Sequence, residues 1–140
     1  MTDIRKVREE HAAIVRILGK LSAVIAKDSP PPSLELFDLR RELSSTLIAH
    51  LKLEDWVLYP SLVNHRDPEV AALGKRFNDE MGGLGAAFTA YSEAWGASAI
   101  GADWKGYCQA TAGIIEALTD RIVRENRELL PVAERIERAA

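Results

Sequence analysis

Four long stripes of apolar residues constrain the fold of this chain more than any other feature. Within each stripe the apolar residues recur at spacings of three and four, which is the period of an amphipathic helix. The stripes run from Asp3 to about Lys27, from Ser33 to about Asn64, from Pro68 to Trp95, and from Asp103 to Ile136. No segment alternates apolar and polar residues with period two, so the sequence predicts helices and no strands.

The segments between the stripes carry residues that begin or end helices. Three consecutive prolines lie between Ser29 and Ser33 and must end the first helix. We expect Thr2 to cap the first helix and Ser33 the second, since hydroxyl side chains accept hydrogen bonds from free backbone N–H groups. Asp67 precedes a proline and is the expected cap of the third helix, and Asp103 of the fourth.

Proline and glycine also occur inside the stripes. Pro60 is expected to kink the second helix or to end its regular part. Gly82, Gly83 and Gly85 lie in the middle of the third stripe, where we expect close packing or local distortion. The stretch from Gly96 to Gly101 breaks the pattern before the fourth helix. The chain is therefore predicted to be all-α, an antiparallel up-down-up-down four-helix bundle.

Composition limits the function classes. The 140 residues fit one domain, residues 1–140, and 18 basic against 21 acidic residues show no block of one sign. We therefore expect no nucleic-acid partner and, because no apolar run approaches the length of a membrane span, no membrane partner. A single cysteine cannot form an internal disulfide, and the charged N-terminus is unlike a signal peptide, so a cytoplasmic location is expected.

Two segments of the chain repeat a pattern of glutamate, leucine and proline. The segment from His50 to Pro60 and the segment from Arg121 to Pro131 carry these three residues at the same offsets. The bundle therefore consists of two similar helical hairpins. Equivalent positions hold His11, His50 and Glu54 in the first hairpin and Met81, Arg121 and Glu125 in the second.

All six of these residues continue apolar stripes and are expected to face the core. Two buried carboxylates, Glu54 and Glu125, need a compensating positive charge, because an unpaired buried ion is very costly. Only a bound metal ion or Arg121 can supply that charge from this sequence. His50 and Glu54, four residues apart on one helix face, form a donor pair that suits iron or zinc.

These residues give the chain a recognisable resemblance. It is similar to the hemerythrin-like (HHE cation-binding) family over about residues 3 to 138, through His11, the segment His50-x-x-x-Glu54 with Leu58-Tyr59-Pro60, and Glu125 with Leu129-Leu130-Pro131. The order His-x-x-x-Glu differs from the Glu-x-x-His order of ferritin-like di-iron bundles. The resemblance implies a hemerythrin-like four-helix bundle with a metal centre in its core.

In that family two irons lie in the core, bridged by two carboxylates. The resemblance maps the bridging carboxylates onto Glu54 and Glu125 and the histidines of one iron onto His11 and His50. The histidine positions of the other iron match Met81, Gly85 and Arg121, none of which is histidine. We therefore expect a degenerate centre, in which Met81 fills the vacated space and Arg121 replaces the charge of the second metal.

The metal content and the function remain open at this point. A metal-free core in which the histidines bond the glutamates, and a site with one iron or zinc, are both consistent with these residues; a full di-iron centre is not expected. The favoured function is a binding or sensing module that acts through an unknown protein partner or a small ligand. The alternatives are a di-iron protein that handles oxygen or iron and a mononuclear non-haem iron enzyme. An enzyme is less expected than a module, and the amphipathic bundle also leaves a homodimer open.

Overall fold

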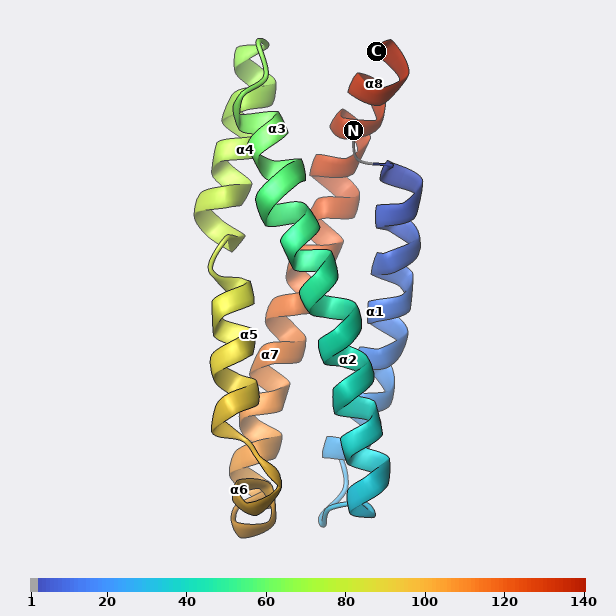
Figure 1. The fold of residues 1–140 in the computed structure, drawn as a ribbon, viewed down its shortest axis with the longest axis vertical. Helices are drawn as coiled ribbons and strands as arrows, with labels where there is room; N and C mark the ends of the chain where they lie inside the picture. Colours follow the sequence, from blue (N-terminus) through green and yellow to red (C-terminus); the bar gives the residue numbers. More distant parts are fainter. Residues whose placement is uncertain (1–2) are drawn as a thin grey trace.

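The computed structural model describes residues 3–140 as four antiparallel helical rods (Figure 1). The first rod is α1 (Ile4–Ile25), and the second consists of α2 (Ser33–Leu53), η1 (Glu54–Leu58) and α3 (Tyr59–Val63). The third is α4 (Pro68–Met81) with α5 (Leu84–Ala94), followed by the short α6 (Ala97–Ala102). The fourth is α7 (Trp104–Arg124), η2 (Glu125–Leu129) and α8 (Leu130–Ala139). The all-α, antiparallel four-helix bundle predicted from the sequence is confirmed.

Side-chain caps begin three of the four rods. Asp3, Asp67 and Asp103 each accept a hydrogen bond from a backbone N–H in the first turn of α1, α4 and α7. The prediction for Ser33 is wrong: it is the first residue of α2, and Pro32 precedes it with no side-chain cap. Thr2, the expected cap of the first helix, lies outside the described residues.

The helix containing Pro60 continues through the proline by widening one turn. In η1 the backbone N–H of Tyr59 donates to the carbonyl of Glu54, five residues earlier, and in η2 that of Leu130 donates to Glu125. Each π-helical turn ends two residues before a proline, η1 before Pro60 and η2 before Pro131. A proline ring collides with the carbonyl four residues earlier in a regular helix, and a wider turn relieves that collision. The two prolines thus fix a wide turn at each of the two buried glutamates.

The third rod is broken between α4 and α5, visible as a thin stretch of chain halfway along the bundle (Figure 1). A Cβ atom at Gly82 would lie 2.6 Å from the carbonyl oxygen of Asn78, so this position requires glycine. The expected distortion is therefore a true interruption at Gly82 and Gly83. The stretch from Gly96 to Gly101, expected to be irregular, instead contains the short helix α6.

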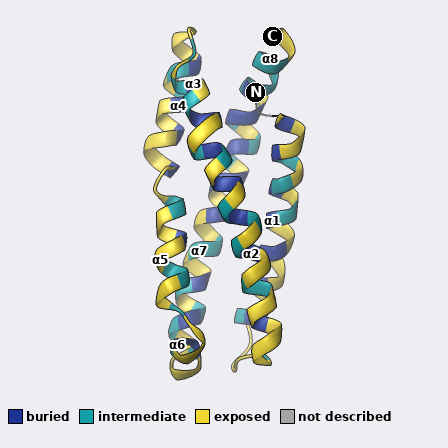
Figure 2. Cartoon of the chain, in the orientation of Figure 1, coloured by how far each residue is buried: buried dark blue, intermediate teal, exposed yellow. Residues whose placement is uncertain are grey.

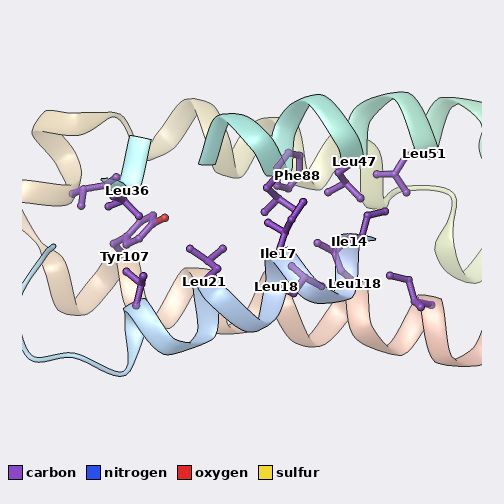
Figure 3. Close-up of a cluster of buried hydrophobic side chains, with 14 residues drawn as sticks. Ile14, Ile17, Leu18, Leu21, Leu36, Leu47, Leu51, Phe88, Tyr107 and Leu118 are labelled. Carbon is purple, nitrogen blue, oxygen red and sulfur yellow. The ribbon is translucent and has the colours of Figure 1, made fainter. Parts of the chain in front are cut away.

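The core consists of two apolar clusters separated by a polar layer. The larger cluster joins α1, α2, α5 and α7, with Leu21, Leu47 and Leu118 among its members (Figure 3). The second cluster lies towards the chain ends and includes Val7, Leu58, Phe77 and Leu129. Between them along the rods come five buried polar side chains, those of His11, His50, Glu54, Arg121 and Glu125. The apolar clusters on both sides keep water away from this layer.

The outward faces of the rods are mostly exposed, and the buried residues face inward (Figure 2). The start of α1 is fastened to α8, since the backbone N–H of Ile4 donates to Glu137 at 3.2 Å and Arg8 pairs with Glu134. Among the described residues, no helix combines the length and the apolar character needed to cross a membrane.

Two glycines provide a matched test of this packing. A Cβ at Gly74 of α4 would lie 2.7 Å from the Cβ of Leu62 in α3, whereas a Cβ at Gly113 of α7 would meet nothing within 4 Å. We expect Gly74→Ala to lower the free energy of unfolding by about 1–3 kcal/mol through overpacking. Gly113→Ala should raise it by about 0.5–1 kcal/mol, since alanine favours helix. Chemical denaturation measures both, and a stabilising Gly74→Ala would show that α3 and α4 do not pack this closely.

Candidate metal centre

Four side chains from three rods converge in the polar layer. His11 comes from α1, His50 and Glu54 from the α2–η1 junction, and Glu125 from the start of η2. Each offers one nitrogen or oxygen atom, and these four atoms all lie within 4.8 Å of one another. All four residues are buried. The structure therefore brings together the four residues that the sequence predicts as metal ligands, in a cluster that could hold a cation.

Each histidine ring is held by a partner on its outer nitrogen. His11 Nδ1 lies 2.7 Å from Asn126 Oδ1, and His50 Nδ1 lies 2.7 Å from Glu10 Oε1. Both partner atoms accept hydrogen bonds, so each Nδ1 carries the proton and donates. The Nε2 atoms then face the carboxylates, at 3.1 Å from Glu54 Oε2 in both cases. An oriented ring whose second nitrogen is hydrogen-bonded is typical of metal-binding histidine.

Each carboxylate also has one oxygen held and one oxygen directed at the histidines. Glu125 Oε2 accepts from the Tyr59 hydroxyl and from Arg121 Nε, while Oε1 lies 3.1 Å from His11 Nε2. Glu54 Oε1 accepts from Arg121 Nη2 at 2.9 Å, which leaves Oε2 for the histidines. The cluster therefore directs one nitrogen or oxygen atom from each of its four residues towards the others.

Arg121 is buried beside this cluster and bonded on every side. Besides Glu54 and Glu125, its guanidinium donates to Asp55 Oδ1 at 2.8 Å and to the carbonyl oxygen of Met81 at 2.9 Å. The ring of Tyr59 lies 5.0 Å from the guanidinium carbon. We expected Arg121 to bond Glu125, Glu54 or both, and it contacts both. A planar guanidinium suits this position because it can serve several acceptors at fixed angles.

The break in the third rod supplies one of these acceptors. α4 ends at Met81, whose carbonyl oxygen accepts from Arg121, and Gly82 and Gly83 follow. The buried Met81 side chain packs with the second apolar cluster. Glu80 points away from the centre and pairs with Arg124 on the surface. The glycines of the third stripe thus help to hold the buried arginine.

Two buried atoms of the cluster have no hydrogen-bond partner among residues 3–140: His50 Nε2 and Glu125 Oε1. Each lies 3.1 Å from another cluster atom, but without the angles of a hydrogen bond. Buried polar atoms are almost always satisfied, so an orphaned nitrogen and an orphaned carboxylate oxygen facing one cluster need an explanation. A cation at the cluster would satisfy both, and the donor set of two imidazoles and two carboxylates fits iron or zinc.

In the metal-free cluster, burial and the close approach of these charged groups shift the pKa values of the residues. Burial lowers the pKa of His11, but its close contacts with the Glu125 and Glu54 carboxylates outweigh burial and raise that pKa to about 10. Burial is likewise the largest influence on Glu125 and raises its pKa to about 7, helped by the nearby charge of Glu54. Burial acts in the same direction on Glu54, but the His11 and His50 rings close to its carboxylate hold its pKa well below the usual range. Without a metal, protons on the histidines supply the charge that the carboxylates require.

Four residues that the sequence analysis did not select complete the centre. Glu10 and Asn126 hold the histidine rings, Asp55 binds Arg121, and Tyr59 donates to Glu125. Two of them could have been found as polar neighbours of predicted ligands in the sequence, because Glu10 directly precedes His11 and Asn126 directly follows Glu125. Periodicity alone could not select them, because Glu10, Asp55 and Asn126 lie at the boundary between core and surface.

Comparison with known proteins gives one result. The family model described as the hemerythrin HHE cation-binding domain matches residues 2–133. The chain belongs to this family. Searches of curated proteins and of solved structures gave no match. For this hemerythrin-family bundle, the cation-binding character of the family agrees with the His/Glu cluster in its core.

The shifted pKa of His11 predicts how the stability of chelator-treated protein depends on pH. A folded-state pKa near 10 against about 6.5 in the unfolded chain contributes stability that is complete below pH 6.5 and is lost as the pH rises through 10. We expect the free energy of unfolding to fall by at least about 2 kcal/mol between pH 6.5 and 10.

His11→Gln is the control, because glutamine does not titrate and should flatten this part of the profile. Denaturant titrations at several pH values provide the measurement. A wild-type protein as stable at pH 10 as at pH 6.5 would contradict the proposed charge on His11.

Proposed function

We propose that this hemerythrin-family bundle binds a single divalent cation, iron or zinc, through His11, His50, Glu54 and Glu125. The observation that carries the proposal is the orphaned pair of buried atoms, His50 Nε2 and Glu125 Oε1, in a cluster whose other polar groups are bonded. A cation would give both atoms a partner, and it would take the place of the protons that the metal-free cluster needs.

Charge balance supports one cation rather than two. Glu54, Glu125 and Asp55 contact Arg121 and together carry three negative charges, of which the guanidinium neutralises one. One divalent cation neutralises the remaining two, with both histidines neutral. A second divalent cation would leave a net positive charge in a buried layer, which is costly. In this proposal Arg121 takes the electrostatic role of a second metal, and Met81 the space.

A role as a binding or regulatory module follows from the burial of the centre. A bound iron or zinc supplies Lewis-acid character, and iron also supplies redox chemistry. The residues of this chain mainly fix and enclose the site: Tyr59 and Arg121 hold the carboxylates, and Asn126 and Glu10 hold the rings. A di-iron oxygen or iron carrier would need further ligands at Met81, Gly85 and Arg121, whose side chains do not offer them. Cation occupancy would then change the stability of the bundle. A protein partner that binds only the more stable form would respond to the cation.

Metal analysis of protein purified without chelator, and after loading with zinc or ferrous iron, tests the stoichiometry. We expect about one metal ion per chain, and His50→Ala should lose it because a ligand is removed. His65→Ala is the matched control, since His65 lies near the loop before α4 and outside the cluster, and it should keep the metal.

Restoring histidine at the positions that the family resemblance assigns to the second metal gives the opposite test. Met81→His with Arg121→His removes the guanidinium and adds two ligands, so the stoichiometry should rise towards two. Wild-type protein that takes up no metal after loading, or that binds two ions with Arg121 in place, would refute the single-cation proposal.

A further inference from the structure

A groove crosses the surface between α2 and the α4–α5 rod, beside the metal centre. Its volume is about 660 Å³, and it is lined by residues of α2, η1, α4 and α5. On the α5 side most of the lining residues are small, Gly85, Ala86 and Ala90 among them, with Glu93 as the longer exception. On the other side lie Lys52 and Trp56. The groove exists because the side chains beside the broken rod are short.

Asp55 connects this groove to the buried centre. Its carboxylate lines the groove, and the side chain is 19% exposed. The same carboxylate accepts from Arg121 Nη2 at 2.8 Å, and that nitrogen also donates to Glu54 Oε1 at 2.9 Å. One nitrogen atom of a buried arginine therefore separates a surface carboxylate from a ligand of the proposed cation.

Gly85 keeps the groove open above Asp55. A Cβ atom built at Gly85 would lie 3.8 Å from Asp55 Oδ2 and 3.9 Å from Leu51 Cδ1, both ordinary contact distances. A methyl group therefore fits at this position, while a longer side chain would extend over the carboxylate. Gly85 is also one of the positions that the family resemblance assigns to the second metal. The missing side chain thus leaves a path where a ligand would otherwise stand.

Glu10 is the other carboxylate through which the network approaches the surface, with its side chain 27% exposed. It is a poorer entrance than Asp55, because it holds the ring of His50 directly at 2.7 Å. Opening the structure at Glu10 would displace a ligand of the cation. Opening the structure at Asp55 displaces that carboxylate and the Arg121 guanidinium that lies between it and Glu54. Neither is a ligand, so all four ligands stay in place.

We propose that a divalent cation enters and leaves the centre through this groove, and that the ion pair between Asp55 and Arg121 is the gate. The route presupposes the cation site proposed above. Such a route would let changes at the protein surface alter the rates of cation entry and release. A molecule that fills the groove, or a change that weakens the ion pair, would act on these rates without contacting a ligand.

Stopped-flow mixing of chelator-treated protein with Co²⁺, followed by the visible absorption of the bound ion, measures entry. Release is measured by mixing the loaded protein with excess chelator. Gly85→Leu should slow entry and release by about tenfold each and leave the dissociation constant unchanged, because a barrier raised on one path affects both directions equally. Asp55→Ala should speed both by at least about threefold, since it removes the gate. Release should be accelerated more than entry, because the substitution also removes one of the three negative charges that balance the cation.

Two further variants keep the test decisive. Ala87→Leu adds the same side chain to an exposed position of α5 outside the groove and should leave both rates unchanged. Ala86→Trp fills the groove from its rim and replaces Gly85→Leu if the latter does not fold.

Folded groove-filled variants with wild-type rates would overturn the route while leaving the cation site intact. Faster exchange in Glu10→Gln at unchanged affinity, with no effect of the groove variants, would place the entrance at Glu10. Wild-type protein that binds no cobalt, zinc or iron would instead refute the proposed site itself.

Discussion

The buried guanidinium of Arg121 is the interaction on which the centre of this bundle depends. It binds both carboxylates of the polar layer and a third at its edge, and it is held in turn by the free carbonyl at the end of α4. Without it, Glu54 and Glu125 would lie side by side between two apolar clusters with too little positive charge. The arginine also directs one oxygen of each carboxylate towards the histidines, so the same contacts that balance charge also shape the candidate cation site.

The backbone around this layer is adapted to it. The π-helical turns at Glu54 and Glu125 begin at the two carboxylates and precede the two prolines, so the repeated Glu-x-x-x-Leu-x-Pro pattern encodes a local backbone shape as well as a buried carboxylate. The break after Met81 gives Arg121 an acceptor and, through Gly85, leaves a groove beside it. Departures from regular helix thus cluster at the level of the proposed site, where π-helical turns are often functional.

The apolar periodicity was enough to predict the four rods and the inward positions of His11, His50, Glu54, Arg121 and Glu125, because core residues repeat with the helix period. The break at Gly82 and the π-helical turns were foreseen only as distortions, since their form depends on tertiary contacts that no single helix reveals. The partners Glu10, Asp55 and Asn126 escaped prediction for a related reason. Half-buried polar residues are as frequent on ordinary helix surfaces, and only the packing of the rods shows which of them reach the centre.

The central claim is that one cation and one arginine occupy the space that two metals fill in a di-iron member of the family. Anomalous X-ray diffraction from crystals of zinc- or iron-loaded protein tests it directly, because it locates the metal and the guanidinium in one experiment. The account predicts a single anomalous peak among His11, His50, Glu54 and Glu125, with Arg121 still bonded to both glutamates. Two peaks in the core, or a single peak with the Arg121 side chain turned to solvent, would contradict it.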